Sequence, residues 1–300
     1  MRKITLCVVL LALCSLVLAQ TPQVPMSVRF AGQTIMLDTE ERYERMDREL
    51  IAFSFMHSSS TLMLKRSGRY FPMIEPILKA NGIPDDLKYL MVIESNLDPK
   101  ALSSAGAAGL WQFTKATAKD YGLEIRDGVD ERYNIEKETQ AACRFLKSAY
   151  EKYGDWMTVA ACYNAGPGGI NKRLEEQRQD SAMDLWLVEE TARYMYRILA
   201  CKMMFEDPSA FGFEISEKDK YPYIEPIRTV DVSSAIGNLV DFAEKYGVTY
   251  AELKAANLWL RGSRLDNKEG KTYTITIPDS HILRSVTTQE ESSAETSKKN

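Results

Sequence analysis

Glu94 is a carboxylate inside an apolar stretch, and its position suits a group that moves a proton. Pro84 is typical of the first turn of a helix. On that helix one face carries the residues at i, i+3, i+4 and i+7, which are Leu87, Leu90, Met91 and Glu94. A carboxylate on an apolar face loses solvation, which raises its pKa and lets it act as a general acid. The alternative is a structural glutamate satisfied by a buried hydrogen bond or a cation.

The residues that follow Glu94 suit contact with a sugar. Asp98-Pro99 predicts the end of the helix. The small residues of 101–109 allow a ligand to approach the backbone closely. Gln112 then offers a donor and an acceptor between two aromatic side chains, and a sugar needs both hydroxyl partners and an apolar ring face. The alternative is a Gly/Ala-rich turn before a core aromatic residue.

The elements that position these residues are predicted to be helices from about Thr39 to Phe205. Apolar residues recur there at helical spacing, in the stripes Met46, Leu50, Phe53; Thr139, Ala142, Cys143, Leu146, Tyr150, Tyr153; and Leu187, Thr191, Tyr194, Ile198, Cys201, Phe205. Breaks are predicted at Asn81-Gly82, at Gly154, in a loop over 166–169 and at Asp207-Pro208. Residues 20–38 are expected to form a leader with little pattern.

The pattern changes after a proline-containing connector at 208–226. Residues 227–232 alternate like a strand, 239–246 and 250–256 indicate two short helices, and 273–277 indicate a second strand. This β-α-α-β unit, 227–279, is small for an independent core and is predicted to be a minor module. The polar residues 280–300 are expected to be a disordered tail.

Residues 1–19 have the pattern of a secretory signal peptide. Arg2 and Lys3 precede an apolar run that ends at Ala19, and the run is short for a membrane span. We therefore expect an exported protein of the periplasm or cell envelope. Cys14 follows a leucine rather than a small residue, which disfavours lipidation. The net charge of −4 and the lack of a basic patch make nucleic acid a poor candidate for a partner.

Three cysteines remain after the signal: Cys143, Cys162 and Cys201. An odd number in an exported protein means an unpaired thiol or an intermolecular bond. Their apolar surroundings favour packing as small hydrophobic residues. His57 and His281 are isolated, so the sequence predicts no metal site and no cofactor.

Three blocks carry a resemblance to a known family. Residues 94–112 read E-S-x5-A-x-S-x2-G-A-x-G-L-W-Q, residues 160–168 read AACYNAGPG, and residues 190–194 read ETARY. In this order they resemble the lytic transglycosylases of glycoside hydrolase family 23, and the layout looks most like the membrane-bound D-type subgroup. The resemblance implies a mainly α, goose-lysozyme-like catalytic domain, with a helical N-terminal extension, over 39–207.

The family's roles fall on matching residues of this sequence. Glu94 corresponds to the single catalytic acid/base. The substrate-binding positions implied by the resemblance are Ser95, Ser103, Gln112, Tyr163, Asn164, Glu190 and Tyr194. For the two tyrosines, core packing with a satisfied hydroxyl is the alternative. Departures from the family pattern are Thr114-Lys115 in place of Met-Pro, Cys162 for alanine, Asn134 for aspartate and Met195 for valine. None of them touches Glu94, and Thr114-Lys115 bears on fine substrate preference.

The implied substrate is the peptidoglycan glycan strand, cut at its β-1,4 bond between N-acetylmuramic acid and N-acetylglucosamine. Ordinary glycosidases use two carboxylates. Asp98 lies past the predicted helix end and Glu190 has a supporting role, so one carboxylate and a 1,6-anhydro product fit best. A hydrolytic muramidase on the same fold and an inactive wall-binding scaffold protein stay open as alternatives.

Residues 239–257 resemble the middle of a LysM module, which is a glycan-binding β-α-α-β fold. The matching residues are Leu239, Ala243, Gly247-Val248, Leu253, Asn257 and Ile277-Pro278. The usual Gly-Asp-Thr before the first leucine is replaced by 236–238, so the module is degenerate, and it serves either to bind glycan or only for packing or spacing. The sequence leaves open the attachment to membrane or wall, the oligomeric state and the choice between endo and exo cleavage.

Overall fold

The computed structural model describes residues 21–279. The predicted signal peptide, 1–19, and the predicted tail, 280–300, lie outside the described residues. The described chain divides into two compact units, one of residues 21–65 and 149–219 and one of residues 66–148 and 220–279. The division falls inside two helices, α3 (His57–Ala80) and α6 (Ile135–Tyr153). Helices predominate in the described part, so the predicted mainly α class is confirmed.

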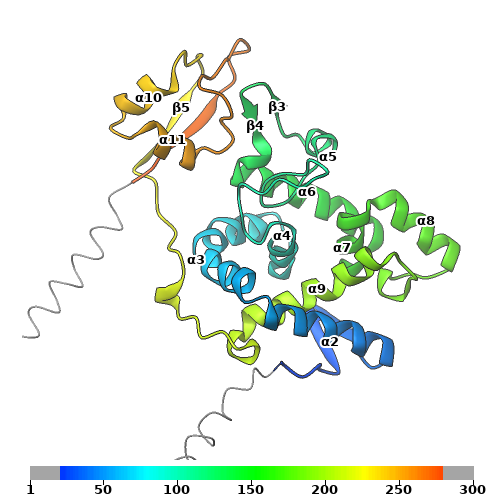
Figure 1. Cartoon of the computed structure of the whole chain (residues 1–300). Helices are drawn as coiled ribbons and strands as arrows, with labels where there is room; N and C mark the ends of the chain where they lie inside the picture. Colours follow the sequence, from blue (N-terminus) through cyan, green and yellow to red (C-terminus); the bar gives the residue numbers. More distant parts are fainter. Residues whose placement is uncertain (1–20, 280–300) are drawn as a thin grey trace, which may run out of the picture. The chain divides into compact units, whose positions relative to one another are not determined.

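The first unit is built around α2, α7 and α9. Apart from its parts of α3 and α6, its elements are β1 (Ser27–Phe30), β2 (Gln33–Met36), α2 (Glu40–Phe55), α7 (Trp156–Ala165), α8 (Pro167–Gln177), η3 (Ala182–Asp184), α9 (Glu189–Glu206), η4 (Pro208–Phe211) and η5 (Glu217–Asp219). Helix α9 packs against α2 and α7 (Figure 1). The predicted stripe of Met46, Leu50 and Phe53 is fully buried, as expected for the core face of α2.

One buried ion pair ties α2 to α9. Glu49 is almost completely buried, and its carboxylate accepts the Nε–H of Arg193 at 2.7 Å and of Arg48 at 3.2 Å. The charge of Glu49 is therefore met from its own helix and from α9, as a buried carboxylate requires.

Two features of the first unit differ from the sequence prediction. Residues 27–36, expected to be patternless, form an antiparallel hairpin of β1 and β2 that turns at Ala31-Gly32, where φ is positive. Each strand has four residues, too few for alternation to be recognised. The predicted loop over 166–169 is also shorter than expected. Only Gly166 interrupts the helices, because Pro167 starts α8 at a position where its missing N–H costs nothing.

The second unit carries Glu94 and the C-terminal module. Apart from its parts of α3 and α6, its elements are η1 (Asp85–Leu87), α4 (Lys88–Ser95), α5 (Lys115–Asp120), β3 (Ile125–Arg126), β4 (Val129–Asp130), η2 (Glu131–Tyr133), β5 (Arg228–Val232), α10 (Leu239–Lys245), α11 (Tyr250–Ala256) and β6 (Tyr273–Ile277). The sheets are two antiparallel pairs, β3 with β4 and β5 with β6.

The predicted β-α-α-β unit is confirmed almost to the residue. Strands β5 and β6 pair along their whole length, from Arg228 with Ile277 to Val232 with Tyr273. Asn238 and Thr249 cap the two short helices, the latter in a capping box with Glu252. These elements lie together in Figure 1. The predicted domain limits of 39–207, 208–226 and 227–279 stay a prediction.

Candidate active site

Glu94 is the one residue of α4 that is not buried. Leu87, Leu90 and Met91 are fully buried, whereas Glu94 is half-buried. The predicted burial of these three residues is therefore confirmed, but α4 is buried on all sides rather than on one face. The helix ends at Ser95, earlier than the predicted stop at Asp98-Pro99, because Asn96 adopts a left-handed conformation with φ of 51°.

The hydroxyl of Ser95 is used within the helix. It is buried and donates to the carbonyl oxygen of Met91 at 3.0 Å. In this geometry Ser95 stabilises the last turn of α4, directly beside Glu94. Its predicted contact with substrate is not supported by this arrangement.

The loop after α4 is folded back on itself by its own backbone. The N–H of Ser103 donates to Ala107 at 2.9 Å, and the hydroxyl of Ser103 accepts the N–H of Ala107 at 3.0 Å. Ser103 is exposed, so it faces solvent from the tip of this turn. Ala108 forms single β-bridges with Leu102 and Phe113, which close the loop over 102–113.

Gln112 ties the two ends of this loop together. Its Nε2 donates to the carbonyl oxygens of Gly109 at 2.7 Å and Ala101 at 3.2 Å. Gln112 also has a φ of 51°, a left-handed conformation that is uncommon for a residue with a side chain. Its donors are therefore occupied by the backbone, and its amide oxygen is the group left for other contacts.

Glu138, which is not among the predicted site residues, holds the same loop from α6. Its carboxylate is fully buried and accepts the backbone N–H of Leu110 at 3.2 Å and of Trp111 at 3.1 Å. Burial raises the pKa of Glu138 well above its ordinary value, although the two N–H groups act in the opposite direction. Like Glu94, it is an acid on an apolar helix face, so the same criterion would have found it.

Arg132 fixes the loop from a second side. Its guanidinium is bound by both carboxylate oxygens of Asp130, at 3.0 and 2.7 Å, and donates to the carbonyl oxygens of Gly106 at 2.7 Å and Phe113 at 3.1 Å. The Arg132 side chain is almost completely buried. The loop passes so close that a Cβ on Gly109 would lie 1.8 Å from the Arg132 carbonyl oxygen.

The other predicted site residues belong to the first unit. Tyr163 and Asn164 are half-buried at the end of α7, Tyr194 is buried, and Glu190 is exposed in the first turn of α9. Asn164 and Glu190 line the same pocket of about 270 Å³, together with Arg173 of α8. This unit therefore brings two of its four predicted residues to one concave surface.

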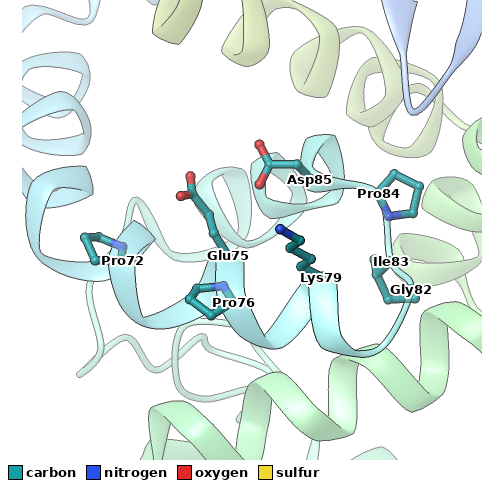
Figure 2. Close-up of a pocket in the computed structure, with 8 residues that line it drawn as sticks. All are labelled: Pro72, Glu75, Pro76, Lys79, Gly82, Ile83, Pro84 and Asp85. Carbon is teal, nitrogen blue, oxygen red and sulfur yellow. The ribbon is translucent and has the colours of Figure 1, made fainter.

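A larger pocket of about 670 Å³ lies elsewhere in the second unit, where α3 leads into η1 (Figure 2). Its charged lining includes Glu75 and Asp85, whose carboxylates both bind Lys88 at 2.6 Å. None of the predicted site residues lines it.

The predicted packing of the cysteines is confirmed, because Cys143, Cys162 and Cys201 are buried free thiols. Among residues 21–279, no group of three or more His, Cys, Asp or Glu side chains is arranged to hold a metal ion. Within the same residues, no helix has the length and apolar character needed to cross a membrane.

Two families match successive parts of the sequence. Residues 72–185, which contain Glu94, Ser103, Gln112 and Tyr163, match the transglycosylase SLT domain. Residues 228–281 match the C-terminal LysM-like domain of soluble lytic transglycosylases. The chain joins an SLT domain to a LysM-like domain.

Individual relatives agree with this assignment. The chain is homologous to membrane-bound lytic murein transglycosylase D of Escherichia coli, with 27% identity over 243 residues, which is 79% of this chain and 52% of that protein. It therefore spans about half the length of this curated relative. The peptidoglycan transglycosylase gp16 of Escherichia phage T7 is 36% identical over 134 residues, 43% of this chain and 10% of that protein.

Among solved structures, the chain is similar to the 70 kDa soluble lytic transglycosylase of Escherichia coli. The identity is 18% and the TM-score 0.42, over 60% of this chain and 33% of that one.

Proposed function

We propose that the protein is a peptidoglycan lytic transglycosylase, exported to the cell envelope, with Glu94 as its single acid/base. The observation that carries the proposal is the half-buried Glu94 at the end of α4, beside the loop that Gln112 closes, within the segment that matches the SLT domain. The substrate is the glycan strand of peptidoglycan, cleaved at the β-1,4 bond between N-acetylmuramic acid and N-acetylglucosamine.

In the proposed reaction Glu94 first protonates the oxygen that leaves the muramic acid. The substrate's own N-acetyl group stabilises the positive charge that develops at C1. The ionised Glu94 then removes the proton from the 6-hydroxyl of the same sugar, whose oxygen closes onto C1. The product has a 1,6-anhydro end and no water is consumed. An intramolecular hydroxyl has a large advantage over water when the site holds it in place.

The neighbouring carboxylates favour a mechanism with one acid/base. Glu138 has no exposed surface and both its oxygens accept backbone N–H groups, so it has no access to a water molecule. Asp98 accepts the N–H of Lys100 and lies 3.7 Å from the guanidinium of Arg66. The carboxylate of Asp98 is therefore already engaged by the backbone of its own turn and by a residue of α3.

Supporting roles follow from the positions of the remaining residues. Ser103 and the amide oxygen of Gln112 are proposed to contact the sugar hydroxyls from the loop. Asn164 and Glu190, which share a pocket, are proposed to bind substrate in the first unit, with Tyr163 and Tyr194 beside them in α7 and α9. Ser95 is proposed to act by stabilising the end of α4 rather than by contact with substrate.

The decisive experiment compares Glu94→Gln with Glu136→Gln, which changes an exposed glutamate in the first turn of α6. Loss of a general acid should slow the release of fragments from purified peptidoglycan by about 10²- to 10⁴-fold. The control should cleave normally. Mass spectrometry of the wild-type products should find anhydro ends, which are lighter than hydrolysed ends by one water.

Each alternative has its own outcome. Reducing ends in place of anhydro ends would identify a hydrolytic muramidase. A wild-type protein that binds peptidoglycan without cleaving it would be a wall-binding scaffold. Full activity of Glu94→Gln would refute the role of Glu94.

A further inference from the structure

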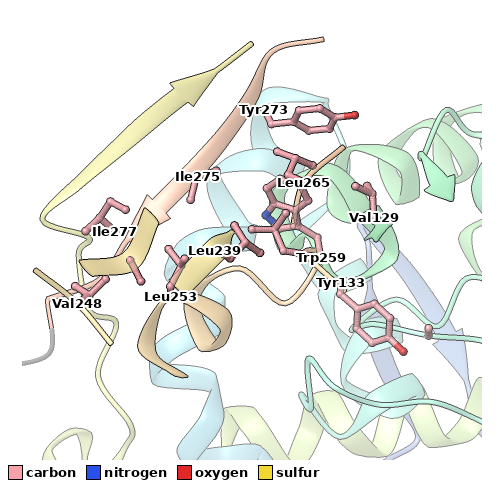
Figure 3. Close-up of a cluster of buried hydrophobic side chains, with 13 residues drawn as sticks. Val129, Tyr133, Leu239, Val248, Leu253, Trp259, Leu265, Tyr273, Ile275 and Ile277 are labelled. Carbon is pink, nitrogen blue, oxygen red and sulfur yellow. The ribbon is translucent and has the colours of Figure 1, made fainter. Parts of the chain in front are cut away.

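The LysM-like domain and the β3–β4 hairpin of the SLT domain share one hydrophobic core. Figure 3 draws this cluster, in which Val129 and Tyr133 pack with Trp259, Leu265 and other side chains of the LysM-like domain. Val129 and Leu260 are essentially fully buried. The guanidinium of Arg261 also lies 4.3 Å from the ring centre of Tyr133. A tethered module would not bury apolar side chains of its neighbour in this way.

Backbone hydrogen bonds fix the register of the contact. The N–H of Asp130 donates to the carbonyl oxygen of Trp259 at 2.9 Å, and the N–H of Arg261 donates to Gly128 at 2.9 Å. These two bonds flank a β-bridge between Val129 and Leu260. The segment after α11 therefore pairs with β4 as an additional short strand.

A polar network closes the same contact at its edge. The Tyr273 hydroxyl donates to the Glu124 carboxylate, whose oxygens both lie at 3.1 Å, and accepts from Arg126 at 3.0 Å. Arg126 also donates to the carbonyl oxygen of Asp266 at 2.8 Å. Burial raises the pKa of Glu124, but the hydrogen bonds from Arg126 and Tyr273 and the positive charges of Lys271 and Arg126 together leave this pKa below its ordinary value. The network therefore combines the ion pair of Arg126 and Glu124 with hydrogen bonds of the neutral Tyr273 hydroxyl to both.

Residues of the β3–β4 hairpin and of η2 also contact the loop of the candidate active site. Asp130, whose N–H binds the LysM-like domain, holds the guanidinium of Arg132 with its carboxylate. Arg132 in turn binds the carbonyl oxygens of Gly106 and Phe113, the two sides of the loop. The LysM-like domain is therefore connected to the loop that carries Gln112 by three successive interactions: the backbone hydrogen bond of Asp130, its ion pair with Arg132, and the hydrogen bonds of Arg132 to the loop.

We infer that the LysM-like domain is a fixed support of the SLT domain, which positions the 106–113 loop through Asp130 and Arg132. Arg132 is then a positioning residue for the proposed cleavage rather than a catalytic one. The importance of the loop for activity rests on the proposed function, whereas the mechanical link between domain and loop does not.

The first test is amide hydrogen exchange in the full chain. Tyr273→Phe removes one hydroxyl from the network and leaves the ring that stacks on Trp259. Loss of its bonds should accelerate exchange in a peptide covering 106–113 by about threefold to tenfold, and Trp259→Leu should do so more strongly. The matched control is Tyr246→Phe, because that hydroxyl makes no hydrogen bond to residues 124–133. Unchanged exchange in the loop for both variants would overturn the inference.

The second test is cleavage of short soluble glycan fragments. Support of the loop predicts that Tyr273→Phe and Trp259→Leu lower kcat with little change in KM. A domain that only tethers glycan predicts a loss confined to intact wall and normal kinetics on fragments, which would contradict the inference. If the wild type cleaves nothing, the proposed function fails, and the exchange experiment still decides whether the domain supports the loop.

Discussion

Replacement of Glu138 by alanine should destabilise the protein far more than an ordinary helix substitution. Its buried carboxylate is the acceptor for the backbone N–H groups of Leu110 and Trp111. Without it two buried donors lose their partner, at about 1–3 kcal/mol each, so the expected loss is about 2–6 kcal/mol. Glu138→Gln keeps one carbonyl oxygen, satisfies one of the two donors and should cost about half as much.

The effect of Glu138 should depend on pH in a defined direction. Burial dominates and raises the pKa of Glu138 well above the value it has in the unfolded chain. The folded state therefore binds this proton more tightly, so the stabilisation is complete below the unfolded pKa and decreases as the pH rises towards the folded pKa. The slope cannot exceed about 1.4 kcal/mol per pH unit. Glutamine does not titrate, so the stability of the wild type relative to Glu138→Gln should fall as the pH rises.

Urea unfolding followed by circular dichroism measures both effects. The wild type, Glu138→Ala and Glu138→Gln are compared at a mildly acidic and a mildly alkaline pH, with Glu136→Ala as the control for a helix glutamate that is exposed. The reasoning would be refuted if Glu138→Ala cost no more than Glu136→Ala. It would also be refuted if the advantage of the wild type over glutamine grew with pH.

Two further predictions concern other buried groups. Gly109→Ala places a Cβ 1.8 Å from the Arg132 carbonyl oxygen at a φ of 83°, so it should lower the free energy of unfolding by several kcal/mol and abolish wall cleavage. The control, Gly106→Ala, has a similar φ but no atom within 4 Å of its Cβ, so it should cost much less. Equal effects of the two substitutions in melting experiments would contradict the geometry. Burial raises the pKa of the Cys143 and Cys162 thiols to about 11. Native protein at neutral pH should therefore react with a thiol reagent far more slowly than protein unfolded in urea. Equally fast labelling of the two states would show that the thiols are accessible.

The two acidic residues near the loop show what the sequence could and could not predict. Helical periodicity was sufficient to place Glu94 beside the buried Leu87, Leu90 and Met91, because these neighbours are set by local spacing, but it did not show that α4 is buried on all sides. The same spacing places Glu138 beside Thr139 and Ala142, yet its role depends on the N–H groups of Leu110 and Trp111, which lie 28 and 27 residues away. An acid on an apolar face is thus recognisable from sequence, whereas its partner is decided by tertiary structure.

In the C-terminal domain, too, the features set by local sequence were predicted and those set by tertiary contacts were not. Its strands and helices were predicted almost to the residue, because alternation and the caps at Asn238 and Thr249 are local signals. The β3–β4 hairpin was missed, because two-residue strands carry no alternation. Its contact with Trp259 and Tyr273 was missed for a different reason, since these residues read equally well as the core of an independent module. Packing of Val129 into that core makes the LysM-like domain part of the SLT domain's structure, and the loop closed by Gln112 should therefore respond to substitutions more than a hundred residues away in sequence.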